Sequence, residues 1–391
     1  MRHKIAIIGP IGDFGGRELE TGFIAKTLQQ DHCEVSVIST TNCSLNSQIF
    51  EFIEPYQFKV LDEILLKKNL LFKVLAQLSY LKSGEKKPLS HYVSNTFSKK
   101  LGYKNYAVKT LRGIVEEFDV ILICAQISSA YVKDIVEYAY GINKQVVIRT
   151  SSKISEKDRL HKDWLEKVTL FIHHSESNAS RLSFLENYSY QVIDQCTYRE
   201  APMLRMDVVN SFKNILFVGR FSPEKGIKEL VTYFKIHGEG LNLTIVGNGP
   251  LYSEVEALIT TESNINLLGY KSQDEVLEYI KASDAIIIPS FKESGPLAGL
   301  EAMASGRLII STKVGAMPHR LKNTLNQFWF DINDAYSLKD VFMKLKGLTK
   351  QDIKNIAQKN RETYLANYRK NTLENLYKNS IFNLLKAKPR D

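Results

Sequence analysis

Two cations that suit the binding of a phosphate group lie close together in the C-terminal half of the chain. Arg220 and Lys225 are five residues apart in the segment 219–226, which directly follows the apolar run 215–218. A guanidinium can bind two phosphate oxygens at once, and a lysine adds a point charge. Ligands bind at the carboxyl ends of parallel strands in open α/β sheets. The pair therefore indicates a site for an anionic ligand, and a surface turn is the alternative.

Two glutamates follow a second apolar run, Ala285–Ile288. Glu293 falls in the loop after this run, and Glu301 lies eight residues later inside a predicted helix. Ionised carboxylates only accept hydrogen bonds, so they suit the hydroxyl groups of a sugar or ribose. Backbone N–H groups at the start of the helix would be open to a diphosphate. The residues that lead into this helix are Ser294, Gly295, Pro296 and Leu297.

Glycines also mark two turns between predicted strands and helices. Gly15 and Gly16 end the first such turn, and Gly247 begins the turn after the second strand of the C-terminal half. The first turn lacks the G-x-G-x-x-G spacing, and no acid ends the following strand at Ser39, which disfavours a redox dinucleotide. The chain has neither a G-K-[ST] phosphate loop nor a D-x-D pair. These absences disfavour an ATPase or kinase and a metal–diphosphate clamp.

The elements that would position these residues alternate between short apolar runs and helical patterns, twice along the chain. Such alternation predicts parallel sheets with helices on both faces. The predicted strands are 4–9, 34–39, 120–125, 145–149, 169–173 and 190–193, then 215–218, 243–246, 265–268, 285–288 and 308–311. We expect an α/β protein of two doubly wound, Rossmann-like domains that face a cleft. Residues 1–204 would form the first domain and residues 205–368 the second, with residues 369–391 as a final helix.

Composition sets the broad class. At about 150 residues per domain, 391 residues suggest two domains, and 44% apolar with 24% charged residues is ordinary for globular proteins. No apolar run reaches the 18–20 residues that span a bilayer, and the N-terminus lacks the pattern of a signal peptide. Four separated cysteines suggest neither disulfides nor a zinc site. We expect a cytoplasmic enzyme without a metal or other cofactor.

The net charge of +9 is concentrated in one stretch. Eleven lysines or arginines and only one acid, Glu85, fall between Ile64 and Ile114, and apolar residues lie among them. Such a basic, amphipathic stretch is typical of a peripheral contact with an anionic membrane surface. A solvated helix pair is the alternative, and nucleic acid is disfavoured because no nucleic-acid-binding motif accompanies the charge.

Taken together, these motifs resemble the retaining glycosyltransferases of family 4, which have the GT-B fold. The resemblance is dense from about Asn214 to Pro318 and looser before it. It rests on Gly219-Arg220 with Lys225-Gly226, Val246-Gly247-Asn248-Gly249, Leu268-Gly269-Tyr270, Ser283-Asp284, and the Glu293 and Glu301 pair.

The resemblance implies a role for each residue. Arg220 and Lys225 would stabilise the departing diphosphate, Glu293 would hold donor-sugar hydroxyls, and Glu301 the ribose. Further donor contacts would come from Gly15, Gly16, Gly219, Gly247, Ser294, Gly295, Pro296 and Leu297. Arg149 stands where many relatives place a donor-contacting histidine, and Asp194 begins the segment that replaces their usual Pro-Asn-Gly. Residues 1–204 would form the acceptor-binding domain and residues 205–368 the nucleotide-sugar-binding domain, and the final helix would cross back to the first of these.

The function that the resemblance implies is metal-independent hexosyl transfer, with retained configuration, from a UDP- or GDP-sugar. The acceptor would be a hydroxyl of a glycan or lipid-linked molecule in the synthesis of a surface polysaccharide. Two alternatives remain at the level of the sequence. One is a nucleotide-sugar epimerase with the same fold, because fold does not determine the reaction. The other is a non-catalytic glycan-binding or scaffold subunit.

Overall fold

The computed structural model describes residues 3–30, 33–259 and 264–386. The chain forms two compact units: Met1–Ile193 together with Glu374–Asp391, and Asp194–Leu373. The sequence places the first division at residue 204. In the structure, residues 194–204 belong to the second unit, where the Thr197 amide donates a hydrogen bond to the Tyr364 hydroxyl.

The first unit is built on a parallel sheet. Among the described residues it has seven strands in the order β3-β2-β1-β4-β5-β6-β7. The strands are β1 (Lys4–Gly9), β2 (Glu34–Ser39), β3 (Phe58–Val60), β4 (Val120–Ala125), β5 (Gln145–Thr150), β6 (Leu170–His173) and β7 (Tyr190–Val192). All six residues of β4 are buried, as expected for a central strand that is covered on both faces.

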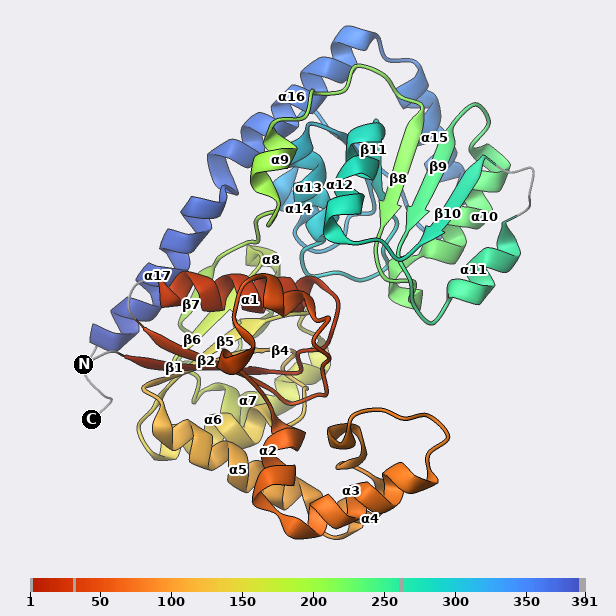
Figure 1. Ribbon diagram of the computed structural model, residues 1–391. Helices are drawn as coiled ribbons and strands as arrows, with labels where there is room; N and C mark the ends of the chain where they lie inside the picture. Colours follow the sequence, from red (N-terminus) through yellow and green to blue (C-terminus); the bar gives the residue numbers. More distant parts are fainter. Residues whose placement is uncertain (1–2, 31–32, 260–263, 387–391) are drawn as a thin grey trace. The chain divides into compact units, whose positions relative to one another are not determined.

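Helices cover both faces of this sheet. Figure 1 shows α1 on one face and α5 and α6 on the other. The helices are α1 (Gly16–Gln29), α2 (Leu61–Lys68), α3 (Leu70–Lys82), α4 (Thr96–Lys100), α5 (Tyr103–Glu117), α6 (Val132–Gly141), α7 (Lys162–Leu165) and α8 (Glu176–Ala179). Most of the last helix, α17 (Lys370–Lys386), also packs here, with Tyr377 edge-on to Phe23 of α1 at 6.3 Å. The predicted return of the final helix to the first unit is therefore present.

The second unit repeats this architecture. Its sheet has the order β10-β9-β8-β11-β12-β13 among the described residues, again with parallel pairing. The strands are β8 (Asn214–Val218), β9 (Asn242–Val246), β10 (Ile265–Gly269), β11 (Ala285–Ile288), β12 (Leu308–Ser311) and β13 (Phe328–Trp329). The helices are α9 (Glu200–Leu204), α10 (Ile227–His237), α11 (Tyr252–Leu258), α12 (Gln273–Ala282), α13 (Leu297–Ser305), α14 (Met317–Arg320), α15 (Ala335–Lys346) and α16 (Lys350–Asn367).

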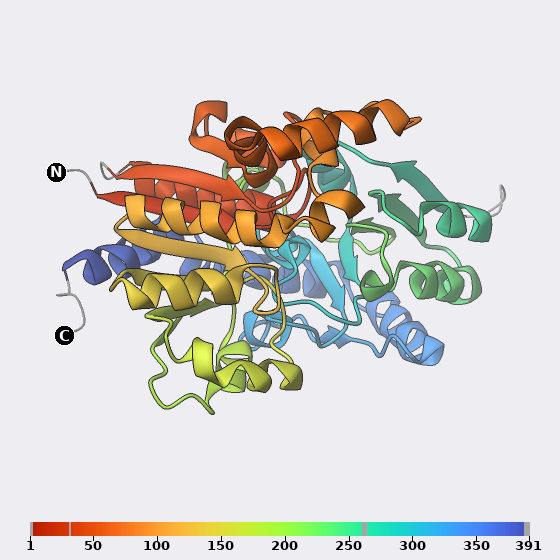
Figure 2. The same ribbon diagram turned by 90° about the horizontal axis from the view of Figure 1, so that it is seen from below.

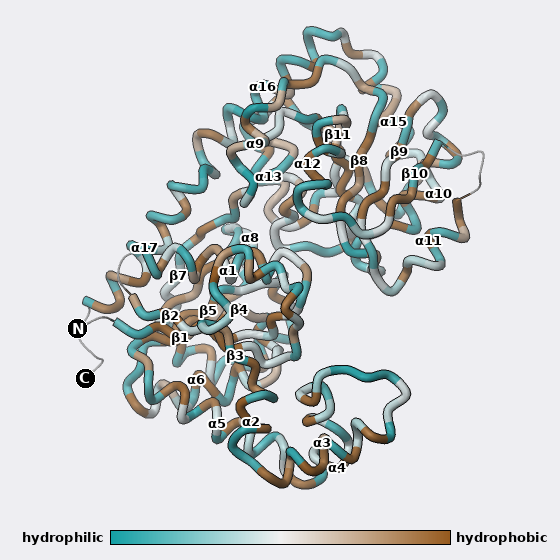
Figure 3. Tube along the Cα trace, viewed as in Figure 1, coloured by the Kyte–Doolittle hydropathy of each residue, from teal (hydrophilic) through white to brown (hydrophobic). Residues whose placement is uncertain are grey.

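Two buried clusters lie on the two faces of the second sheet. One joins the strands to α10 and α15, and the other joins them to α12, α13 and α16. The strands are accordingly the most hydrophobic parts of the trace (Figure 3). The predicted α/β class with two parallel, Rossmann-like sheets is confirmed. The sequence missed β3 and β13, which are three and two residues long at sheet edges and too short to show a pattern.

Candidate functional site

The loops after β8 and β11 are joined directly at the carboxyl edge of the second sheet. The Phe291 amide donates a hydrogen bond to the Glu224 carbonyl at 2.8 Å. Gly226 has the left-handed φ of 64°, and a Cβ there would lie 2.1 Å from the Pro289 carbonyl oxygen. Only glycine permits so close an approach of two backbones. The segments that carry the predicted cations and Glu293 are therefore held side by side.

These two loops bring predicted residues into contact. The Lys225 ammonium, in the short 3-10 helix η6 (Pro223–Lys225), forms an ion pair with the Glu293 carboxylate. The Ser290 hydroxyl also donates to Glu293, at 3.4 Å. Arg220 is exposed, and nothing in the described part of the chain accepts a hydrogen bond from its guanidinium. Of the two predicted cations, Arg220 therefore has no ion-pair partner among the described residues, and Lys225 is shared with a carboxylate.

The predicted glycines of the second unit also lie together. A Cβ on Gly247, whose φ is 143°, would lie 1.9 Å from the Gly219 carbonyl oxygen. The Gly219 amide donates to the Val246 carbonyl at 3.1 Å, and the Phe221 amide donates to the Asn248 carbonyl at 2.9 Å. Gly247 therefore allows the loops after β8 and β9 to pack closely, and this packing positions the segment that contains Arg220.

The segment 294–297 leads into α13 next to Glu293. The Ser294 carbonyl accepts a hydrogen bond from the Ala316 amide at 2.9 Å, and a Cβ on Gly315 (φ 54°) would lie 2.5 Å from that carbonyl oxygen. Pro296 is the N-cap of α13, and within the described residues no side chain caps this helix. The first N–H groups of α13, which carry the positive end of the helix dipole, remain available to an anion.

A buried ion pair that the sequence did not predict supports this segment. Arg320 of α14 is fully buried and pairs with Asp194, with Nε–Oδ2 at 2.9 Å and Nη2–Oδ1 at 2.5 Å. Its Nη1 donates to the Pro296 carbonyl at 2.5 Å. Asp194 and Arg320 are 126 residues apart, and the only signal at the sequence level was the unusual segment that begins at Asp194. The pair therefore positions the start of α13.

Glu301 lies one turn inside α13 and is 7% exposed. Burial raises the pKa of its carboxyl from 4.5 to about 7. No described residue donates a hydrogen bond to its side chain. A buried carboxylate without a donor is unfavourable in its ionised form. Glu301 is therefore able to accept hydrogen bonds from a ligand.

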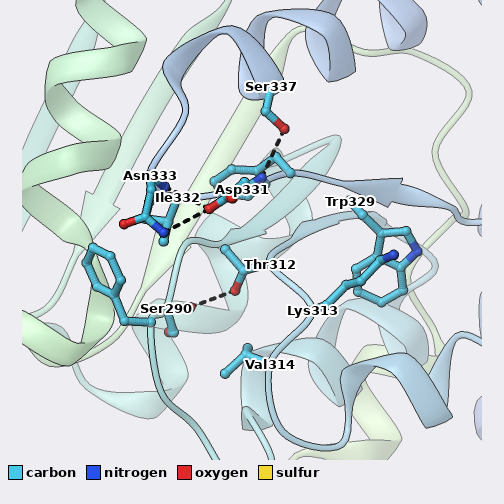
Figure 4. Close-up of a pocket in the computed structure, with 11 residues that line it drawn as sticks. Ser290, Thr312, Lys313, Val314, Trp329, Asp331, Ile332, Asn333 and Ser337 are labelled. Carbon is cyan, nitrogen blue, oxygen red and sulfur yellow. Dashed lines mark hydrogen bonds between the residues drawn. The ribbon is translucent and has the colours of Figure 1, made fainter.

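A pocket of about 490 Å³ opens beside this site, at the ends of β11, β12 and β13 (Figure 4). Trp329 and Lys313 lie on one side of the pocket, Asn333 lies on the other side, and Ser337 lies above (Figure 4). At its base the Thr312 hydroxyl donates to the Ser290 carbonyl at 2.7 Å. None of the predicted site residues lines this pocket; Ser290 connects it to Glu293.

The two predicted glycines of the first unit, Gly15 and Gly16, lie at the start of α1. Gly15 is the N-cap of α1 with φ 143°, and its amide donates to Gln48 Oε1 at 2.9 Å. Gly16 begins α1, and a Cβ there would meet nothing within 4 Å. Both are exposed. Their contact with a donor stays a prediction.

Arg149 lies in a buried polar cluster of the first unit. Its Nε and Nη2 donate to Glu20 Oε1 at 2.9 and 2.6 Å, and Tyr377 donates to the same oxygen at 3.3 Å. His174 Nε2 lies 3.3 Å from Glu20 Oε2. These partners outweigh the desolvation of Glu20 and lower the pKa of its carboxyl to about 2. Since Arg149 is fully buried, contact with a donor would require this cluster to open, and that role also stays a prediction.

No group of three or more histidines, cysteines, aspartates or glutamates in the described ranges is arranged to hold a metal ion.

Comparisons with known proteins agree with the fold, and a family model matches much of the second unit. Residues 208–363 match the family described as glycosyl transferases group 1. An uncharacterized glycosyltransferase of Methanocaldococcus jannaschii is 23% identical over 71% of this chain and 80% of its own length. The N-acetyl-alpha-D-glucosaminyl L-malate synthase of Bacillus anthracis is 28% identical over 46% of this chain, and this chain spans about half of its length, 49%.

Solved structures extend the similarity to both units. HepE of Anabaena in complex with UDP has a TM-score of 0.70 at 16% identity, over 97% of this chain and 100% of that one. The pneumococcal O-GlcNAc transferase GtfA in complex with UDP and GlcNAc has a TM-score of 0.69 at 12% identity, over 99% and 100%. These structures show that the fold is the GT-B fold. Of the two sequence relatives above, one is described as a glycosyltransferase and the other as a synthase.

Proposed function

We propose that this protein is a retaining glycosyltransferase that moves a hexose from a nucleoside diphosphate to a hydroxyl group. The observation that carries the proposal is the junction of the loops after β8 and β11. It sets Arg220, the Lys225–Glu293 pair and the start of α13 at one edge of a sheet. The match of residues 208–363 to glycosyl transferases group 1 covers this whole arrangement.

The second unit would bind the donor. The diphosphate would lie against Arg220, Lys225 and the first N–H groups of α13, with Gly219, Gly247 and residues 294–297 close enough for backbone contact. The exposed, unpaired Arg220 can give both of its forked donors to phosphate oxygens. Glu301 would accept hydrogen bonds from the ribose hydroxyls, which would satisfy a buried carboxylate that has no donor in the structure.

Glu293 would hold hydroxyls of the transferred sugar. As the bond between the anomeric carbon and the diphosphate oxygen breaks, the acceptor oxygen forms a new bond on the same face, and its proton passes to the departing diphosphate. Negative charge grows on the diphosphate in this step, and Lys225 and Arg220 would stabilise it more in the transition state than in the ground state. Lys225 already contacts Glu293, so it would link the diphosphate to the carboxylate that holds the sugar.

The donor would carry UDP or GDP, and we would test UDP-sugars first because the HepE and GtfA structures contain UDP. We propose a glycan or lipid-linked acceptor in the synthesis of a surface polysaccharide. The amylovoran biosynthesis glycosyltransferase AmsK of Erwinia amylovora, which is 26% identical over 36% of this chain, supports this choice of acceptor. We assign neutralisation of the diphosphate to side chains and α13, and we expect activity in the presence of a chelator.

The test is a panel of nucleotide sugars, scored by thermal stabilisation of the protein and by release of nucleoside diphosphate. Each hydrogen bond to a charged group contributes about 1.5–3 kcal/mol. Arg220→Ala should therefore weaken donor binding or transfer by roughly one to two orders of magnitude. Lys354→Ala, at an exposed lysine of α16, is the matched control and should have no effect.

Four results would count against parts of this proposal. No response to any nucleotide sugar, or an Arg220→Ala variant equal to the Lys354→Ala control, would contradict donor binding at this edge. Interconversion of the donor sugar without an acceptor would indicate an epimerase. Inverted configuration in the product, measured by NMR at the anomeric proton, would contradict retention.

A further inference from the structure

The helices that follow β3 form a lobe of the first unit, residues 61–117, in which α3 is only lightly packed. Figures 1 and 2 show α2, α3 and α4 of this lobe, in orange, at the periphery of the unit. Phe72 and Ala76 are the buried residues of α3. The Phe72 ring meets Tyr103 and Tyr106 of α5 edge-on, at 6.0 and 5.2 Å between ring centroids. The opposite face of α3 is left uncovered.

That uncovered face carries a stripe of apolar side chains. Leu71, Val74, Leu78 and Leu81 follow one another at spacings of three, four and three residues, which places them on one side of a helix. They are 44, 45, 52 and 73% exposed. The same lobe also exposes Leu70, Phe97, Leu101 and Tyr106. Single exposed leucines are ordinary, but large exposed apolar side chains gathered in one lobe indicate an interaction surface.

The same lobe carries lysines that have no acidic partner among the described residues. In the described part of the lobe, no carboxylate lies within ion-pair distance of eight exposed lysines: Lys67, Lys68, Lys73, Lys82, Lys99, Lys100, Lys104 and Lys109. Two other lysines are engaged within the lobe. Lys87 pairs with Glu85 at 3.0 Å, and Lys86 donates to the Tyr80 carbonyl at 2.9 Å. The lobe therefore combines an apolar face with an uncompensated positive charge.

We propose that the lobe binds an anionic membrane surface, with Leu71, Val74, Leu78 and Leu81 inserted among the acyl chains and the lysines at the headgroups. An apolar stripe flanked by lysines matches such a surface, which is apolar below and negatively charged above. The 13 residues of α3 extend about 20 Å at 1.5 Å per residue, short of the roughly 30 Å of a bilayer core. The helix lies in the interface, and in the described residues no helix is long and apolar enough to span a bilayer.

Two other partners would match either the positive charge of the lobe or its apolar stripe, but not both. A second copy of the chain would cover the leucines, but it would also bring two sets of unpaired lysines together, which like-charge repulsion opposes. A nucleic acid would attract the lysines through its phosphates, yet it would leave the row of aliphatic side chains without a partner. Only a surface that is both anionic and apolar satisfies the two features at once.

The test is binding of the full-length protein to vesicles, measured by co-sedimentation without any nucleotide sugar. We expect binding to phosphatidylcholine vesicles that contain phosphatidylglycerol, a decline of that binding as salt increases, and little binding to phosphatidylcholine alone. Each lysine at an anionic surface strengthens binding about fivefold. Lys73→Gln with Lys82→Gln should therefore weaken binding roughly 25-fold. Leu78→Gln with Leu81→Gln should weaken it by a similar factor, since each inserted leucine contributes about fivefold or more.

Matched controls lie in the second unit. Ile236→Gln removes an apolar side chain that is 64% exposed, and Lys354→Gln removes an exposed lysine. Both should bind vesicles as the unmodified protein does. Because every substituted side chain is exposed, thermal unfolding should be unchanged in all variants, so loss of binding would not reflect misfolding.

Several outcomes would overturn the proposal. Equal binding to neutral and anionic vesicles would contradict the role of the lysines. If neither pair of substitutions changes vesicle binding, the proposal that this lobe is the membrane-binding surface is wrong. Light scattering will show whether the protein is a dimer. A dimer that dissociates in the Leu78→Gln with Leu81→Gln variant, together with no binding to vesicles, would show that a second copy covers the stripe. None of these outcomes depends on whether the protein transfers a sugar.

Discussion

Replacement of Glu301 by glutamine should change how the stability of this protein depends on pH. Burial raises the pKa of the Glu301 carboxyl from 4.5 to about 7. One pKa unit corresponds to about 1.36 kcal/mol. The ionised carboxylate therefore lowers the free energy of unfolding by about 3 kcal/mol relative to the protonated form. This difference arises from desolvation alone, because no described side chain donates a hydrogen bond to Glu301.

The sign follows from the protons that each state binds. Between pH 4.5 and about 7 the folded chain keeps a proton on Glu301 that the unfolded chain has lost. The free energy of unfolding must then decrease as pH rises through this window, and it stays low above pH 7. Glutamine keeps the size of the side chain and does not ionise. Glu301→Gln should match the unmodified protein near pH 4.5 and should be about 3 kcal/mol more stable at pH 8.

Urea unfolding of both proteins from pH 5 to pH 8 measures this difference directly, because the other titratable groups are common to both and cancel. The donor adds a second readout. Ribose hydroxyls would favour the ionised carboxylate, so binding of a UDP-sugar near pH 7 should release a proton. The calorimetric enthalpy of binding should accordingly vary with the ionisation enthalpy of the buffer, and Glu301→Gln should abolish this variation.

Parallel stability profiles of the two proteins across this pH range would refute the reasoning that Glu301 is buried without a partner. If the two stability profiles differ as expected but the enthalpy of donor binding does not depend on the buffer, Glu301 is buried as described and does not contact the ribose.

Three further changes test the remaining parts of the site. Glu293→Gln should lower kcat more than it raises the donor KM, because the carboxylate lies beside the cation that would stabilise the transition state; a change in KM alone, in steady-state kinetics, would reject that role. Arg320→Met should lower the free energy of unfolding by about 3–5 kcal/mol, because it removes the guanidinium that pairs with the buried Asp194 carboxylate; urea unfolding that matches the unmodified protein would contradict this. Glu20→Gln should remove stability that is present above pH 4.5 and is lost as pH falls toward 2, since Arg149 and His174 lower the pKa of the Glu20 carboxyl to about 2. Acid-unfolding curves of the two proteins that coincide would show that the cluster does not stabilise the fold through charge.

Much of the fold could be predicted because its signals are local. β1, β2, β4, β11 and β12 have the predicted limits, since each is a short run of apolar, mostly β-branched residues between turns. The strands β3 and β13, of three and two residues, show no such pattern and were missed.

The candidate site was also predictable only in part. The sequence by itself identified Arg220, Lys225, Glu293 and Glu301 as residues suited to a phosphate and to hydroxyl groups, because side-chain chemistry and position after a strand are both properties of the local sequence. Parallel pairing of β8 and β11 then makes it reasonable that the loops after them meet. The exposure of Arg220 and the shared Lys225–Glu293 pair were not evident at that level.

Only the tertiary structure decided which distant charges pair and which carboxylates lose their water. Arg149 was expected at the donor, yet it faces Glu20, 129 residues away, in the interior of the first unit. The sequence predicted no role for Arg320, although its guanidinium binds both the Asp194 carboxylate and the Pro296 carbonyl. Glu301 resembles any helical glutamate until α13 is packed. The reason is physical: burial and long-range pairing depend on which surfaces of the folded chain meet, whereas sequence patterns report only how each segment folds locally.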